Sequence, residues 1–156
     1  MFQAKEVIYG FFKDISTPKN KYLIVLHRDA NLLVTACFTT SQQRAGIPLG
    51  EIVHGVCKNA SGEVISYVFL KGQTIGVNPT TGEPFSFPRQ TTVTFDYGVH
   101  QIYYEKLSSD SFLENPKVVC VLSDAEYINL VYAMYRSPKT KGTIKSVLQS
   151  ILEQQG

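Results

Sequence analysis

The first two thirds of the chain carry short apolar runs and apolar–polar alternation, which is the pattern of β-strands. Three candidate strands open the chain, at Glu6–Lys13, Lys21–His27 and Leu32–Thr39. The second is an almost unbroken apolar run, as expected for a strand that is buried on both faces. Because a short polar stretch at 29–31 separates the second strand from the third, we expect these two strands to pair as an antiparallel hairpin.

Turn-forming residues divide the next part of the chain into further strands. The segments Glu51–Cys57 and Glu63–Leu70 flank a turn-rich stretch and predict a second hairpin. The stretch Gly72–Pro88 holds three Gly and three Pro, so we predict a long loop there, with one short strand at Thr74–Val77. Strands are expected again at Gln90–Tyr97, Gln101–Leu107 and Lys117–Leu122.

After residue 122 the apolar residues recur with the period of a helix. Ser123 and Glu126 have the spacing of a capping box, in which the hydroxyl and the carboxylate each satisfy a backbone amide of the other residue. Pro138 ends the first predicted helix, and a second amphipathic helix follows Gly142. We therefore predict a single domain over residues 1–156, mainly β with C-terminal helices.

Composition agrees with a folded domain. The chain is 44% hydrophobic and 18% charged, which is typical of globular proteins. Its net charge of +2 is too small to indicate a nucleic-acid partner, so such a site would have to come from local clustering of charge. Three cysteines without C-x-x-C spacing fit a reducing compartment. No apolar run approaches the length of a membrane span, and we expect a cytoplasmic protein that does not contact membranes.

Standard catalytic signatures are missing from the sequence. It has no phosphate-binding loop, no G-x-S-x-G elbow, no H-E-x-x-H and no paired Cys/His spacing for zinc. His27, His54 and His100 lie far apart on different predicted elements. We therefore expect neither a metal site nor a cofactor.

The polar loop after the first hairpin is the strongest candidate for chemistry. Residues 39–44 read Thr-Thr-Ser-Gln-Gln-Arg, with Thr40, Ser41 and Gln42 ahead of Arg44. Hydroxyls and amides hydrogen-bond phosphates and bases, and a guanidinium can hold a phosphate with two parallel hydrogen bonds. In the alternative interpretation the hydroxyls only close the strand and the arginine is solvated.

A second candidate interleaves aromatic and cationic residues. Phe85 and Phe87 precede Pro88 and Arg89, an arrangement typical of a stacking platform for single-stranded nucleic acid. An edge strand whose alternating aromatic residues belong to the core would have the same pattern, and both interpretations remain open.

In order along the chain, these segments resemble the MazF/PemK/Kid family of toxins from type II toxin–antitoxin systems. That family has a strand of the pattern R-P-x-L-V-I, a later strand ending in [ST]-[TS]-x-x-x-[KR], and an L-P after it. KYLIVL at Lys21–Leu26 is similar to the first strand, and VTACFTTSQQRAGIP at Val34–Pro48 is similar to the second. PRQTTVTFD loosely resembles the family's R-x-x-[ID]-D segment, and LSDAEYINLVYAMYRS with the final helix resembles its C-terminal tail.

The resemblance implies both a fold and an activity. The fold would be an SH3-like small β-barrel with a C-terminal helix, shared with the gyrase-poisoning toxin CcdB and assembled as a homodimer. The activity would be metal-independent, acid–base transesterification of single-stranded RNA. In this reaction an arginine and a Ser/Thr hydroxyl act on the ribose 2′-oxygen and the scissile phosphate. An antitoxin protein would be a second partner.

Carried over by position, the resemblance implies roles for individual residues. Thr40 takes the place of the family's catalytic hydroxyl, and Lys21 stands where the family has its arginine. Lys21 and Arg44 would stabilise charge on the phosphate in the transition state. The residues that would hold the substrate are Ser41, Gln42, Phe87 and Arg89.

Two departures from the family pattern favour a different function class. Lys21 keeps the positive charge of an arginine but lacks the planar fork that holds a phosphate in fixed geometry. Tyr22 replaces the usual proline after it. The alternative is therefore a non-catalytic binding module on the same barrel, which engages an antitoxin peptide or an enzyme subunit.

Overall fold

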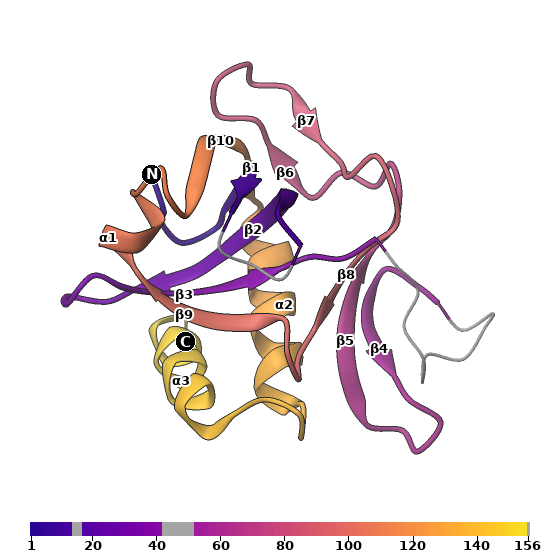
Figure 1. The fold of residues 1–156 in the computed structure, drawn as a ribbon. Coiled ribbons are helices and arrows are strands. Elements are labelled where there is room, and N and C mark those ends of the chain that lie inside the picture. The colour runs from indigo at the N-terminus through magenta and orange to yellow at the C-terminus, as the bar shows by residue number, and fades with distance from the viewer. Residues whose placement is uncertain (14–16, 42–51, 156) are drawn as a thin grey trace.

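The structure, a computed structural model, describes residues 1–13, 17–41 and 52–155 (Figure 1). Its strands form two antiparallel sheets. The larger has seven strands in the order β7-β6-β10-β1-β2-β3-β9, and the smaller has three in the order β4-β5-β8. The strands of the large sheet are β1 (Glu6–Phe12), β2 (Lys19–Arg28), β3 (Leu33–Phe38), β6 (Gly76–Val77), β7 (Pro84–Phe85), β9 (Val99–Tyr103) and β10 (Leu113–Leu122). The strands of the small sheet are β4 (Gly55–Lys58), β5 (Val64–Phe69) and β8 (Thr91–Thr94).

The interior of the large sheet is buried on both faces. Strand β2 has no exposed surface at any of the four residues from Leu23 to Leu26. Successive side chains of a strand point to opposite faces. Accordingly, Ile24 and Leu26 belong to one hydrophobic core and Leu23 and Val25 to another. This explains why the sequence of β2 is continuously apolar rather than alternating.

Helices at the end of the chain cover one face of the large sheet (Figure 1). They are α2 (Asp124–Arg136) and α3 (Gly142–Gln155). The larger core lies between these helices, the small sheet and that face, and includes Leu130 and Leu148 from the helices. The opposite face packs against the N-terminal segment and the region around the short helix α1 (Tyr104–Leu107), through Phe2 and Leu107 among others. Among the described residues, no helix has the length and apolarity needed to cross a membrane.

The two sheets meet at Thr40, just beyond the end of β3. Its backbone N–H donates to the carbonyl of Thr92 on β8 at 2.8 Å, and the N–H of Thr92 donates back to the carbonyl of Thr40 at 2.8 Å. The strands of the small sheet run across the direction of β2, β3 and β9 (Figure 1). The backbone of Thr40 is therefore held between two sheets of different orientation.

Much of the predicted architecture is confirmed. The chain is mainly β, with antiparallel sheets and C-terminal helices. The hairpins β2–β3 and β4–β5 both form, and α2 ends before Pro138. The strand pairing of the described residues gives two sheets, and it does not by itself close a single barrel.

Several predictions about local structure are wrong in part. The strand predicted at Gln90–Tyr97 ends at Thr94, and the strand predicted at Lys117–Leu122 begins earlier, at Leu113. The strand predicted at Gln101–Leu107 ends at Tyr103, because Tyr104 begins a helical turn. The loop at Gly72–Pro88 contains a second short strand, β7, beside the predicted one. The capping box is only half formed. Ser123 Oγ accepts from the N–H of Glu126, but the Ser123 N–H donates to the carbonyl of Ile75.

Candidate functional site

A cleft of about 410 Å³ lies where β2 and the end of β3 meet the segment leading into β8. Lys21 and Thr40, the two residues that the sequence singled out, both line it. The cleft is therefore built at the junction of the two sheets. Its other lining residues are Tyr9, Lys19, Asn20, Tyr22, Thr39, Ser41, Pro88, Arg89 and Thr91.

Strand register brings Lys21 and Thr40 together. Leu23 of β2 is opposite Phe38 of β3, and the N–H of Thr39 donates to the carbonyl of Tyr22 at 3.3 Å. Continuing this antiparallel register by one residue sets Thr40 across from Lys21. Because the backbone of Thr40 is also bonded to β8, this half-buried residue is held from two sides.

The cleft is cationic. Lys19, Lys21 and Arg89 line it, and no Asp or Glu is among the described lining residues. The Nζ atom of Lys21 lies 5.3 Å from the centroid of the Phe38 ring, a cation–π contact that restricts where the ammonium points. Hydroxyl groups of Thr39, Thr40 and Ser41 are interspersed with these charges. This combination suits an anion that accepts several hydrogen bonds.

Two tyrosines add an aromatic wall. Tyr9 and Tyr22 are directly opposite each other in the β1–β2 pair, with ring centroids 4.7 Å apart. Tyr22 in turn packs edge-on against Phe87 at 4.9 Å. Burial raises the pKa of Tyr22, and the neighbouring Tyr9 raises it further. The Tyr22 ring therefore stays neutral at neutral pH, and both rings line the cleft with aromatic surface.

The structure brings together four of the seven residues predicted for the site, namely Lys21, Thr40, Ser41 and Arg89. Phe87 lies elsewhere: it has no exposed surface and belongs to the larger core, so the core interpretation of its aromatic pattern agrees with the structure. Its ring supports Tyr22 from behind and is not open to a ligand. Gln42 and Arg44 lie outside the described residues.

Several residues that line the cleft were not predicted from the sequence, including Lys19, Tyr9 and Tyr22. Tyr22 was considered only as a replacement for a proline. The signal that identifies the aromatic pair is the register of β1 against β2, which sets Tyr9 opposite Tyr22. Register depends on turn geometry as well as on the apolar pattern, so the pattern of each strand alone does not supply it.

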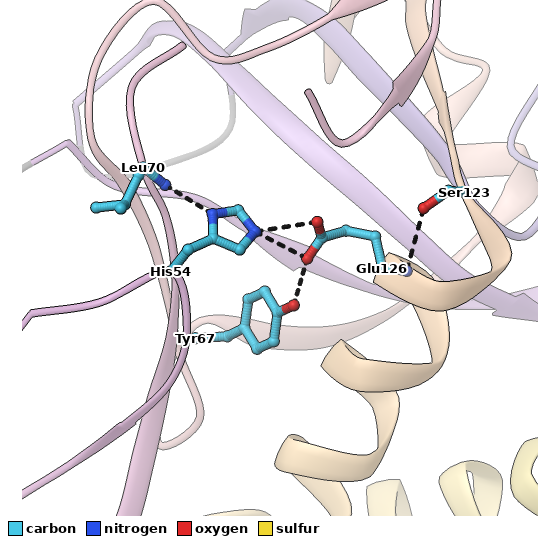
Figure 2. Close-up of polar contacts among 5 residues, drawn as sticks. All are labelled: His54, Tyr67, Leu70, Ser123 and Glu126. Atoms are coloured by element: carbon cyan, nitrogen blue, oxygen red, sulfur yellow. Dashed lines mark hydrogen bonds and ion pairs between the residues drawn. The ribbon is translucent and has the colours of Figure 1, made fainter. Parts of the chain in front are cut away.

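A second polar cluster lies between the small sheet and α2 (Figure 2). The Nε2 atom of His54 is 3.0 Å from Oε1 and 3.1 Å from Oε2 of Glu126. The hydroxyl of Tyr67 donates to Oε2 of the same carboxylate. The N–H of Leu70 donates to Nδ1 of His54 at 3.1 Å.

These contacts determine which tautomer the neutral ring of His54 adopts. Because Nδ1 accepts a hydrogen bond from Leu70, it carries no proton, so in the neutral ring Nε2 carries the proton and donates to Glu126. The side chains of His54 and Glu126 are only 13% and 11% exposed. Burial is the main cause that raises the pKa of Tyr67, followed by its hydrogen bond to Glu126. The cluster is a satisfied network that ties β5 to α2, and we assign it a structural role.

No arrangement suited to a metal ion is found within the part of the chain that the structure describes. There, no group of three or more His, Cys, Asp or Glu side chains is close enough to hold one. The described residues of the cleft offer cations, hydroxyl groups and aromatic rings.

Comparison with known proteins does not assign the chain to a family. No family model matches it, and neither the curated proteins nor the solved structures give a significant match.

Proposed function

We propose that the protein binds single-stranded RNA in the cationic cleft and cleaves it by metal-independent transesterification. The observation that carries this proposal is the convergence of Lys21, Thr40 and Arg89 from separate segments on one cleft. Cations and hydroxyl groups line this cleft, with no carboxylate among its described lining residues.

The charge pattern suits a phosphodiester backbone. Each phosphate carries a negative charge, and cationic side chains that neutralise it release counterions, which drives binding at low salt. Lys19, Lys21 and Arg89 can contact neighbouring phosphates or converge on one. Hydroxyl groups beside them can hydrogen-bond the non-bridging oxygens. The cleft thus offers both the charge and the hydrogen-bond donors that the backbone requires.

The aromatic wall suits a single strand more than a duplex. Bases of a single strand are free to stack on tyrosine rings, and such stacking contributes about 1–3 kcal/mol per base. Tyr9 is 37% exposed and lies beside Tyr22. In this proposal these tyrosines take the stacking role that the sequence pattern suggested for Phe87.

Catalysis would use charge and hydrogen bonds placed before the substrate arrives. Lys21 stabilises the extra negative charge on the phosphate in the transition state, as a fixed cation in a partly desolvated cleft does. Thr40 and Ser41 position the phosphate, and Arg89 holds a flanking nucleotide. An ammonium lacks the bidentate geometry of a guanidinium, and its contact with the Phe38 ring limits where it points.

The other features that the resemblance to the MazF/PemK family implies are part of the same proposal. They are an SH3-like barrel built from the two joined sheets, a homodimer, a cytoplasmic location and an antitoxin partner. The two-sheet junction at Thr40 and Thr92 supports the first of these. Analytical ultracentrifugation tests the homodimer, which predicts twice the 17.4 kDa mass of the chain.

A non-catalytic binding module is the second candidate. A cleft with three cations and no described carboxylate would also accept an acidic peptide from an antitoxin or an enzyme subunit. Such a module would bind its ligand through Lys21 and Arg89 and would leave RNA intact.

One experiment separates the two candidates. Purified protein is incubated in EDTA with a mixed-sequence single-stranded RNA and compared with the variants Lys21→Ala and Thr40→Ala. The control is Lys58→Ala, which removes an exposed lysine at the end of β4. We expect cleavage by the wild type and by the control, and a loss of about 100-fold or more in the other two. No cleavage by the wild type at high concentration would leave only the binding module.

A further inference from the structure

A second cavity adjoins the cleft and shares Lys21 and Thr40 with it. This cavity of about 240 Å³ is also lined by His100, which is absent from the lining of the first. Lys21 and Thr40 therefore line both cavities. The remaining residues of the second cavity are Thr17, Lys19, Phe38, Thr39, Thr94, Tyr97 and Gly98.

His100 lies on β9, which forms an edge of the large sheet beside β3. Its ring centroid is 5.4 Å from that of Phe38, at an interplanar angle of 71°. The Nζ atom of Lys21 is 5.3 Å from the centroid of the same Phe38 ring. Phe38 therefore contacts both groups, and the imidazole of His100 and the ammonium of Lys21 line the same cavity.

The proposed reaction needs a group that the first cavity lacks. Transesterification of RNA begins when the 2′-hydroxyl loses its proton, and a positioned base accelerates this step. Lysine and arginine are protonated at neutral pH, and threonine and serine are weak bases. Among the described residues that line the two cavities, His100 has the side chain best suited to accept a proton near pH 7.

The surroundings of His100 favour its neutral form. Burial lowers the pKa of His100, and the charges of Lys141 and Lys21 lower it further. A hydrogen bond with the backbone of Tyr97 opposes these effects, as expected when one ring nitrogen donates to a carbonyl. When one nitrogen of a neutral ring is the donor, the other nitrogen is free of protons and can accept one. Lys19 and the Tyr97 ring are the other titratable groups that line the cavity.

We propose that His100 is the general base of this site, an inference that rests on the function proposed above. Its unprotonated nitrogen accepts the proton of the ribose 2′-hydroxyl. The 2′-oxygen then bonds to phosphorus while the bond between phosphorus and the 5′-oxygen breaks. The leaving 5′-oxygen takes a proton from the Lys21 ammonium. The products are a 2′,3′-cyclic phosphate and a 5′-hydroxyl, and proton exchange through water restores His100 and Lys21.

The test compares His100→Ala with a matched control, His27→Ala, which changes a half-buried histidine near the far end of β2. Two quantities are measured for each protein. The first is the single-turnover rate of RNA cleavage between pH 5 and pH 8, a range that brackets the ordinary pKa of about 6.5 for histidine. The second is the affinity for the same RNA carrying 2′-O-methyl groups, which cannot react. Circular dichroism verifies that each variant is folded.

We expect the rate of His100→Ala to be about 100-fold lower than that of the wild type. The wild-type rate should fall at acidic pH, and the rate of the variant should not. Both proteins should bind the methylated RNA with the same affinity. Added imidazole should restore part of the rate of this variant, because it can occupy the space left by the ring. If the wild type cleaves RNA and His100→Ala cleaves it at the same rate, His100 is not the general base, while the proposed function stands. No cleavage by the wild type would overturn the proposed function and this role with it.

Discussion

The Nε2 atom of His54 lies 3.0 Å from Oε1 of Glu126, although 72 residues separate the two in the chain. This contact joins the segment before β4 to the first turn of α2, and the hydroxyl of Tyr67 completes it from β5. Figure 2 shows both donors converging on one carboxylate. The network fixes α2 against the small sheet and so supports the junction at which the cleft is built.

Replacing Glu126 by leucine should destabilise the protein strongly. The variant leaves the His54 N–H and the Tyr67 O–H buried without an acceptor, and each unsatisfied donor costs about 1–3 kcal/mol. Glu126→Gln should cost less, because its carbonyl can accept from His54 while its amide donates to the Tyr67 oxygen. Urea denaturation measures both. Glu153→Leu, at an exposed site near the end of α3, is the control. An equal cost for Glu126→Leu and Glu153→Leu would contradict the structural role of the network.

Gly76 cannot carry a side chain without displacing β6 from β10. A Cβ atom there would lie 2.1 Å from the carbonyl oxygen of Val121 and 2.7 Å from Sγ of Cys120. We therefore expect Gly76→Ala to lower the free energy of unfolding by about 1–3 kcal/mol, as overpacking does. In Gly142→Ala, by contrast, the added Cβ meets nothing within 4 Å, and that variant should be as stable as the wild type. Thermal denaturation measures the melting midpoints of the two variants. Similar midpoints would show that β6 does not pack closely against β10 at Gly76.

Tyr127 should make the protein less stable in alkali. Burial raises the pKa of Tyr127 to about 12, above its value of about 10 in an unfolded chain. Between these two values the unfolded chain loses the proton while the folded protein keeps it. The contribution of Tyr127 is thus fully present below about pH 10 and falls as pH rises towards about 12.

The matched substitution is Tyr127→Phe, with Tyr132→Phe at a half-exposed position on the same helix as control. Tyr127→Phe loses the 2.7 Å hydrogen bond to the Leu26 carbonyl, so it should be about 1 kcal/mol less stable near neutral pH. Its free energy of unfolding should then fall less steeply in alkali than that of the wild type. Identical alkaline slopes in the wild type and Tyr127→Phe would contradict this assignment.

Binding of single-stranded RNA should depend on salt through the cations of the cleft. Each phosphate contact to a single strand contributes about 0.7 to the slope of log affinity against log salt. We expect Lys21→Ala and Arg89→Ala each to weaken binding and to reduce that slope by about this amount. Lys58→Ala should change neither. Fluorescence anisotropy with methylated RNA measures the slopes, and equal slopes in all four proteins would mean that RNA binds elsewhere.

The fold was predictable where the signal is local. The apolar run of β2 and the polar turn after it predict the β2–β3 hairpin, because burial on both faces removes polar residues from the strand. Cys37 of β3 and Cys120 of β10 lie in apolar strands, and both are fully buried. By contrast, the end of β9 was missed. Tyr104 begins a helical turn there, and its N–H is satisfied by the distant carbonyl of Leu32.

The site was predictable only in part, since it depends on contacts between distant segments. Lys21 and Thr40 flank a hairpin, so their proximity follows from local pairing. Arg89 reaches the cleft because β8 bonds to Thr40, and no local sequence pattern predicts that contact. Glu126 illustrates the same limit. Its spacing from Ser123 indicated a capping box, whereas its carboxylate binds His54 from the segment before β4 and Tyr67 from β5.

The chemical identity of the cleavage products tests the central claim most directly. An end-labelled single-stranded RNA is treated with the protein in EDTA, beside the same RNA with a 2′-O-methyl group at the cleaved position. We expect products that end in a 2′,3′-cyclic phosphate, no cleavage at the methylated position, and a loss of cleavage in Lys21→Ala. Intact RNA, or cleavage that continues at the methylated position, would contradict that claim.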